Sequence, residues 1–159
     1  MAECCPPGDE ASSPSKTTHG LCSLCGGRGT RVSTLTVKSL VRQHSRVAAA
    51  PNLYFFCRNR ACDVVYFAEK HAFLTRDLKV RVGMKESLDP IPLCYCFAYT
   101  REDICRDMDV SGSSRILMHI KAEIRDGFCS CEVKNPSGTC CLGEIVATIQ
   151  GFKKNFPAS

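Results

Sequence analysis

Cysteine is the residue type that offers most chemistry in this chain, with thirteen among 159 residues. This is roughly 8% of the sequence, close to the level that marks a scaffold built on cysteines. Many of them stand in C-x-x-C, C-x-C or C-C pairs, spacings that chelate metal ions well, and their number is odd. In a reducing compartment such thiols stay free to bind metal. The sequence therefore favours metal binding over a disulfide framework.

The first set of cysteines consists of two short pairs. Cys22 and Cys25 form a C-x-x-C motif followed by two glycines, and Cys57 and Cys62 form a second pair, with thirty-one residues between Cys25 and Cys57. Two such knuckles beside strands predict a tetrahedral zinc site, and four thiolates leave no position for water, so the site is expected to be structural. The competing interpretation is four buried apolar cysteines. His19 is a rival ligand that a complete Cys4 set does not need.

The second set begins with a C-x-C pair, Cys94 and Cys96, and is completed some thirty residues later. Four thiolates arranged in this way suit a [2Fe-2S] cluster better than a second zinc, and amides at helix N-termini favour its negative charge. Neighbouring cysteines seldom ligate together, since their side chains diverge. We expect Cys131 and Cys141 as the remaining ligands, with Cys129 and Cys140 as the second choice. Cys105, inside a predicted helix, is expected in the core.

Strands are predicted in the first half, where short runs are rich in Val, Thr, Tyr and Phe and have Gly and Asn at their borders. The predicted strands cover 31–37, 52–57, 63–68 and 78–82. Between the first two, residues 38–47 are expected to form a short helix or an irregular loop.

Helices are predicted in the second half. Thr100 followed by Asp103 has the pattern of a capping box, Ser113 or Ser114 opens a second helix, and Gly127 is placed to end it. A third helix is expected from about residue 141 onward. The apolar positions at helical spacing in the last two helices are Ile116, Leu117, Ile120, Ile124, Leu142, Ile145, Val146, Ile149 and Phe152.

The change of period divides the chain into two small units of an α+β protein. Residues 1–20 are expected to form a disordered tail, 21–86 a zinc-ribbon-like β domain, 87–92 a proline-containing linker and 93–155 a small helical domain. Each unit is near or below the size at which a hydrophobic core alone is marginal. Metal ions are expected to supply the missing stability.

Composition excludes several other classes of protein. The net charge of +5 is mild and its densest cluster, Arg42 to Arg46, is expected to be a solvated face, so no nucleic acid is expected. No stretch has the ~20 apolar residues of a membrane span, and the first twenty residues lack the apolar run of a secretory signal. We therefore expect a cytoplasmic protein. The four histidines show no hydrolytic zinc motif, so we expect no enzyme.

Three stretches resemble the N-terminal region of the CopZ-type copper chaperones, which combine a zinc ribbon with a [2Fe-2S] domain. They are FCRNRACDVVYF at 56–67, CYCF at 94–97 and CSCEVKNPSGTCCLGE at 129–144. The second half also resembles the Bfd-like ferredoxin domain, although its usual closing C-x-x-C is absent. The resemblance implies zinc at the first cysteine set and a [2Fe-2S] cluster at Cys94, Cys96, Cys131 and Cys141.

The resemblance also implies a role in handling copper or a related soft metal, with the cluster giving electrons, for example to reduce Cu(II) to Cu(I). Chaperones of this family continue into a domain with M-x-C-x-x-C, which does not follow here. We therefore expect a partner of a separate metallochaperone or metal transporter, in copper or mercury handling. Cys4 and Cys5 are soft ligands of the kind that capture such ions. The alternative hypothesis is a zinc-ribbon binding module whose cysteines are all structural.

Overall fold

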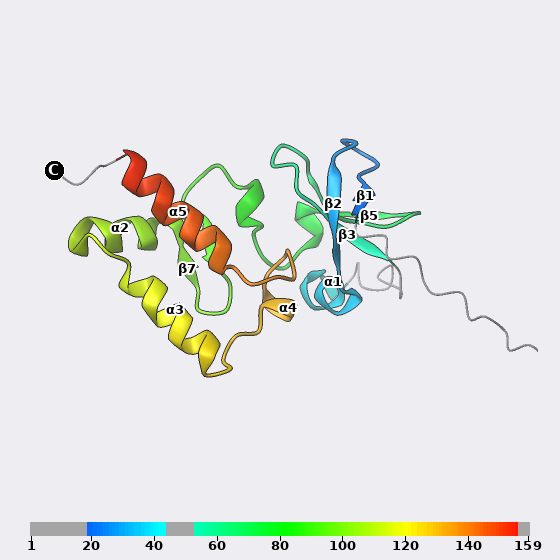
Figure 1. Cartoon of the computed structure of the whole chain (residues 1–159). Helices are drawn as coiled ribbons and strands as arrows, with labels where there is room; N and C mark the ends of the chain where they lie inside the picture. Colours follow the sequence, from blue (N-terminus) through cyan, green and yellow to red (C-terminus); the bar gives the residue numbers. More distant parts are fainter. Residues whose placement is uncertain (1–18, 44–52, 156–159) are drawn as a thin grey trace, which may run out of the picture.

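The computed structural model describes residues 19–43 and 53–155 of the chain. An antiparallel sheet occupies the first half and helices occupy the second, so the fold is α+β (Figure 1). The pair Cys4 and Cys5 and part of the basic cluster at 42–46 lie outside the described residues. Within the described ranges no helix is both long and apolar enough to cross a bilayer.

Five short strands form the sheet of the first half. Each pairs with the next in antiparallel fashion, in the order β1-β2-β3-β4-β5, as expected when hairpins follow one another along the chain. The two central strands, predicted at 52–57 and 63–68, are confirmed and are buried on both faces. The strands are β1 His19–Leu21, β2 Arg28–Val32, β3 Tyr54–Cys57, β4 Val64–Phe67 and β5 Ala72–Leu74.

One predicted strand is partly a helix. The run at 31–37 was expected to be extended, but its second part belongs to α1, Thr34–Leu40. The physical reason is Ser33, whose side chain accepts a hydrogen bond from the amide of Thr36 and so caps the helix. This local bond outweighs the strand preference of the Thr and Val side chains. Val37 and Leu40 of α1 are buried.

The last predicted strand of this half is wrong. Residues 78–82 make only an isolated bridge, between Leu78 and Val41, and are flanked by the 3-10 turns η2, Thr75–Asp77, and η3, Gly83–Lys85. The side chains of Leu78 and Val82 are nevertheless buried in the core with Tyr54, Phe56 and Tyr66. Apolar spacing therefore predicted burial correctly and pairing incorrectly, because among the described residues this run makes only the single bridge to Val41.

The second half contains a two-stranded hairpin, β6 and β7, and four helices. The helix starts predicted at Thr100 and Ser114 are confirmed, since both side chains accept a hydrogen bond from an amide in the first turn. Gly127 has a φ of +85°, as expected after the end of a helix. The elements are β6 Pro92–Cys94, β7 Tyr99–Thr100, α2 Arg101–Ser111, α3 Arg115–Arg125, α4 Cys131–Lys134 and α5 Leu142–Asn155.

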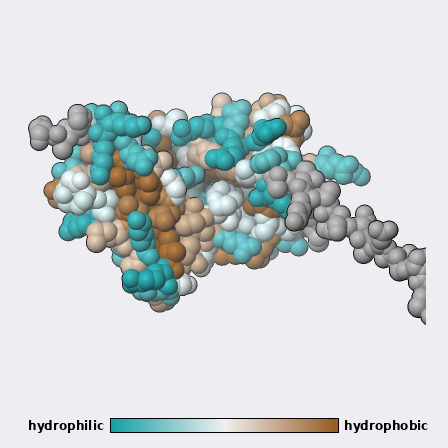
Figure 2. Space-filling view, viewed as in Figure 1, coloured by the Kyte–Doolittle hydropathy of each residue, from teal (hydrophilic) through white to brown (hydrophobic). Residues whose placement is uncertain are grey.

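The helical half has its own core, built by the predicted apolar stripes. Ile104, Ile120 and Ile145 contribute one fully buried side chain each from α2, α3 and α5. Cys94 and Cys141 belong to the same cluster of buried residues. Figure 2 shows a band of hydrophobic surface running beside α3, where the partly buried members of this core reach the surface. The core is small, as expected for a unit of this length.

Candidate metal centres

The cysteines of the first set come together at one end of the sheet. Cys22 and Cys25 lie in the turn between β1 and β2, while Cys57 ends β3 and Cys62 precedes β4. Because β2 pairs with β3 with Gly29 opposite Cys57, the two turns lie side by side. The four sulfur atoms are all within 4.8 Å of one another.

The distances between these sulfurs suit a tetrahedral ion. Cys22 Sγ and Cys62 Sγ are 4.0 Å apart, and Cys25 Sγ and Cys57 Sγ are 3.7 Å apart. Zinc–sulfur bonds of about 2.3 Å place tetrahedral ligand atoms about 3.8 Å from each other. The arrangement leaves no gap in the ligand set for water or a substrate.

Backbone groups shape each of the two turns. The amide of Gly26, with a φ of +66°, donates to the carbonyl of Cys22, and the amide of Gly27 donates to Cys25 Sγ at 3.4 Å. In the second turn, the ammonium of Lys85 donates to the carbonyls of Asn59 and Cys62, at 2.8 and 2.9 Å. Lys85 lies in a loop remote in sequence, so no spacing rule could have predicted this contact.

The surroundings shift the pKa values of Cys25, Cys57 and Cys62 in different directions. The hydrogen bond from the Gly27 amide lowers the pKa of Cys25 to about 6, whereas burial raises the pKa of Cys57 to about 12 and also raises that of Cys62. A metal ion binds thiolates and displaces such protons. Three buried or half-buried thiols held this close are therefore arranged for a cation.

Two aromatic rings support this end of the sheet. Phe55 and Phe67 stack with their centroids 5.5 Å apart and share a cluster of buried residues with Cys22, Cys57 and Cys62. The sulfurs are thus part of the hydrophobic core here. A Cβ atom on Gly29 would lie 2.6 Å from the ring of Phe67, so only glycine fits beneath it.

The second set of cysteines forms a group in the helical half. Cys96, Cys129 and Cys131 have all their sulfurs within 4.8 Å of one another. Cys131 Sγ is 3.6 Å from Cys96 Sγ and 3.2 Å from Cys129 Sγ. The amide of Ser130 donates to Cys96 Sγ at 3.3 Å. Cys96 and Cys129 are half-buried, so this group reaches the surface.

A second pair of thiols adjoins this group. The neighbouring thiol of Cys141 lowers the pKa of Cys94 to about 6, and the same interaction raises the pKa of Cys141. Cys94 and Cys141 are only 1% and 2% exposed. Of the four expected cluster ligands, Cys96 and Cys131 thus lie in the three-sulfur group, whereas Cys94 and Cys141 lie outside it.

The structure separates the competing cysteines of this half. Cys129 lies within the three-sulfur group, whereas Cys140 is exposed and outside it. The signal for Cys129 in the sequence is its C-x-C spacing to Cys131, and Cys129 was expected only as a second choice of ligand. Cys105, which was expected in the core, lies on α2 and is only half-buried.

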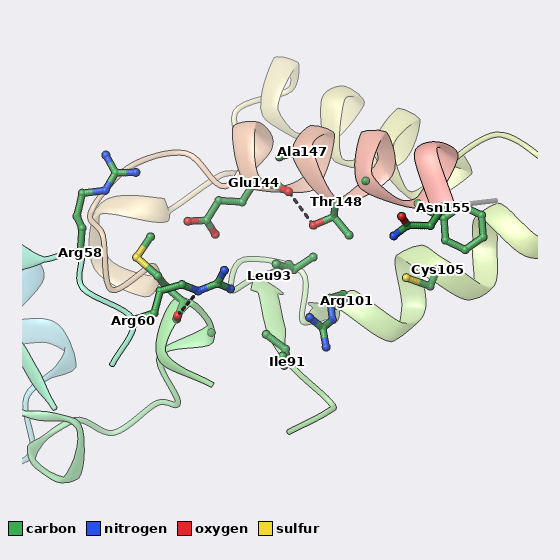
Figure 3. A pocket seen from close by; sticks show the side chains of 14 residues that line it. Arg58, Arg60, Ile91, Leu93, Arg101, Cys105, Glu144, Ala147, Thr148 and Asn155 are labelled. Atoms are coloured by element: carbon green, nitrogen blue, oxygen red, sulfur yellow. Dashed lines mark hydrogen bonds between the residues drawn. The ribbon is translucent and has the colours of Figure 1, made fainter. Parts of the chain in front are cut away.

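A groove lies between the turn that carries Cys57 and Cys62 and helix α5. Figure 3 shows Arg60 and Glu144 extending into it from opposite walls, with Cys105 and Asn155 at the far end. Its volume is about 710 Å³. Arg60 is oriented by the hydrogen bond from its Nε to the carbonyl of Met84, at 3.1 Å. The groove has one cationic end and an apolar floor that includes Ile91 and Leu93.

Replacement of Glu144 by glutamine is expected to stabilise the protein at neutral pH. Burial raises the pKa of Glu144 above its ordinary 4.5, partly offset by Arg58 and Arg60. A carboxyl whose pKa is higher in the folded state costs stability as the pH rises above 4.5. The melting temperature of Glu144→Gln should exceed that of the wild type by about 1–3 °C at pH 7, and the difference should vanish below pH 4.5. Thermal melts followed by circular dichroism across this range test it.

The exposed loop carboxylate Glu69 provides the control for this measurement. Glu69→Gln should melt like the wild type at every pH. A Glu144→Gln protein that melts lower than the wild type at pH 7 would mean that the carboxylate is stabilised by Arg58 and Arg60 by more than its burial costs.

An α+β fold with four converging thiols at the end of a small sheet defines a cysteine-rich zinc-binding protein. The comparison with protein families agrees, because residues 19–79 match a family model described as "Zinc binding domain". This range contains all four cysteines of the first set. Zinc is thus the metal supported for the first half of the chain.

The similar proteins extend the match over both halves. The chain is 34% identical over 138 residues to the copper chaperone CopZ of Archaeoglobus fulgidus, covering 84% of this chain and 65% of the chaperone. It also matches the X-ray structure of the CopZ N-terminal domain of the same organism, with a TM-score of 0.67, 31% identity and 86% of this chain covered. The match includes 98% of that domain. The chain belongs to the family of the CopZ N-terminal domain.

Proposed function

We propose that this protein is a non-enzymatic redox metalloprotein that handles copper or another soft metal. It holds a structural zinc ion and a [2Fe-2S] cluster and acts beside a separate metallochaperone or metal transporter. The observation that carries the proposal is the group of Cys96, Cys129 and Cys131, which is separate from the first cysteine set and reaches the surface. The relative named as a copper chaperone supports the choice of metal.

Cys22, Cys25, Cys57 and Cys62 are the proposed zinc ligands. All four thiolates are used, so this ion has no open position and its role is to hold the two turns of the sheet together. The support is geometric, since the sulfur distances of 3.7 and 4.0 Å are those of a tetrahedron around zinc.

Cys94, Cys96, Cys131 and Cys141 are the proposed ligands of the cluster. Their donor set fits, because a [2Fe-2S] cluster takes four thiolates and gains from N–H donors to its sulfurs. The amide of Ser130 already donates to the sulfur of Cys96 in this site. When bound, the cluster supplies single-electron transfer. The half-exposed Cys96 marks the side on which an acceptor such as Cu(II) would approach.

Reduction of Cu(II) by the cluster-loaded protein tests this function directly. The protein, purified without oxygen, is reduced with dithionite, freed of excess reductant and mixed with Cu(II) and a chelator that colours with Cu(I). The visible absorbance should return to that of the oxidised cluster, with Cu(I) formed in an equal amount. Each cluster loses one electron, and each Cu(II) gains one.

The thiols themselves can reduce Cu(II), so an iron-free variant is needed as the control. Cys131→Ala, expected to lack the cluster, reports the Cu(I) that comes from thiol oxidation alone. A reduced cluster that stays reduced while Cu(II) is present would refute the redox role. A zinc-loaded protein that contains no iron or sulfide after anaerobic purification would instead support the zinc-ribbon binding module.

A further inference from the structure

The segment that connects two proposed cluster ligands is packed against the zinc-binding half. Residues 135–140 join α4, which begins with Cys131, to α5, which follows Cys141. Figure 1 shows α4 beside α1, at the place where the two halves of the molecule meet. We call residues 131–141 the ligand loop. Its conformation determines where two of the four sulfurs lie.

A tyrosine of the sheet is hydrogen-bonded to this loop. Tyr66, in β4, is 0% exposed, and its hydroxyl donates to the carbonyl of Pro136 at 2.7 Å in a buried contact. Burial raises the pKa of Tyr66, so the hydroxyl keeps its proton and remains a donor. Without the Tyr66 hydroxyl, the carbonyl of Pro136 would lose this buried hydrogen bond, and an unpaired buried carbonyl costs free energy of folding.

Further contacts hold the loop from the side of β2 and α1. Gly138 has a φ of +69°, and a Cβ atom there would lie 3.0 Å from Thr36 Oγ1 and 3.1 Å from Val32 Cγ2. Ser33, which caps α1, donates to Glu132 Oε1 at 3.1 Å. The loop therefore contacts β2, α1 and β4. The strands β2 and β4 directly follow the two turns that carry the first set of cysteines.

The inside of the loop is also fully hydrogen-bonded. Asn135 is 4% exposed, and its Nδ2 donates to the carbonyl of Thr139 at 2.8 Å. Its Oδ1 accepts from the amide and the hydroxyl of Ser137, both at 3.1 Å. The loop is held by hydrogen bonds within itself and by contacts with the zinc-binding half. Because the internal bonds remain when the outer contacts are removed, the loop should then move as a unit.

We propose that the zinc-binding half holds the ligand loop in place for the cluster and that Tyr66 is the positioning residue in this contact. The inference rests on the proposed cluster site. Its consequence is that the two metal centres are coupled: whatever loosens the sheet or removes the Tyr66 hydroxyl increases the opening of the ligand loop and speeds the loss of the cluster.

Two tyrosines of neighbouring strands make a matched pair for the test. Tyr66→Phe removes the hydroxyl bond to Pro136 in the other half, whereas Tyr54→Phe removes a hydroxyl bond to His71 within the zinc-binding half, at 3.0 Å. Both side chains are 0% exposed and belong to the same core. Zinc content and near-ultraviolet circular dichroism show whether each variant is folded.

Hydrogen exchange of the iron-free, zinc-loaded protein gives the first readout. Amides of residues 135–141 should exchange about tenfold faster in Tyr66→Phe than in the wild type, and those in Tyr54→Phe should be unchanged. In the iron-loaded protein, the cluster absorbance should decay in the presence of an iron chelator about tenfold faster in Tyr66→Phe only. Equal exchange at 135–141 in the two variants would overturn the inference.

A second variant tests the same contact from the other side of the loop. Gly138→Ala forces a methyl group toward Thr36 and Val32, and Gly112→Ala, at a φ of +65° with open space around it, repeats the backbone strain without a contact. Only Gly138→Ala should speed exchange in the ligand loop. Exchange is measured without iron, so a chain that never binds a cluster refutes the proposed function and leaves this test of the loop intact.

Discussion

Replacement of Cys57 by alanine is expected to unfold the five-stranded sheet. Cys57 is 0% exposed, belongs to the buried cluster with Phe55 and Phe67, and has its sulfur 3.7 Å from that of Cys25 in the first turn. Zinc contributes about 10–16 kcal/mol to small structural sites, whereas whole domains are stable by only about 5–15 kcal/mol. The sheet cannot retain its fold when that contribution is lost.

The measurement is zinc content together with thermal unfolding followed by circular dichroism. Cys57→Ala should contain no zinc and show no cooperative transition from the sheet. Cys105→Ala, which removes a half-buried thiol of α2 outside both sulfur groups, should bind zinc and melt close to the wild type. A Cys57→Ala protein with a full zinc content and an unchanged melting curve would contradict the proposed ligand set.

The short strand β1 shows why the metal is needed. Its three residues are exposed or half-buried, and its end residue Leu21 is 71% exposed. Apolar burial therefore contributes little to holding β1, and the thiol of Cys22, 2% exposed, is its main anchor in the core. Chelation of zinc from the wild type should accordingly release β1 and its turn before the centre of the sheet, seen as early loss of amide protection at 19–27.

Alanine at either Cys96 or Cys131 is expected to abolish the iron cluster. Both sulfurs lie in the three-sulfur group, 3.6 Å apart, and Cys96 Sγ accepts a hydrogen bond from the amide of Ser130. Removal of one of four thiolates leaves an open iron position and a ligand set that no longer encloses the cluster. Iron, sulfide and visible absorbance of the anaerobically purified variants should fall to background, while zinc content stays at the wild-type level.

The chain supplies matched controls within its own cysteine pairs. Cys129 neighbours Cys131 and Cys140 neighbours Cys141, so Cys129→Ala and Cys140→Ala remove a thiol from the same segment without removing a proposed ligand. Both should retain the cluster, with Cys129→Ala shifting its absorbance because its sulfur is 3.2 Å from Cys131 Sγ. Iron lost from Cys129→Ala and retained in Cys131→Ala would reverse the assignment of these two residues.

The first cysteine set shows which features of a metal site can be predicted from the local sequence. Cys22 with Cys25 and Cys57 with Cys62 each span a single turn of a hairpin, so their spacing alone predicts that each pair faces one ion. The pairing of β2 with β3 brings the two pairs together, and this pairing was not predicted, because the first strand was expected at 31–37 whereas β2 covers Arg28–Val32. Helix starts at Thr100 and Ser114 were predictable, because a capping bond is made within four residues.

Hairpin turns, caps and short chelating pairs are local features, so the class of the protein and its thiol chemistry could be predicted from the order of residues. Tertiary structure alone decided which of Cys129 and Cys140 lies beside the other sulfurs, where Lys85 binds, and that Tyr66 holds the ligand loop across seventy residues of sequence. The physical reason is that such contacts depend on how two folded halves meet, and residues brought together only by packing leave no periodic signal along the chain.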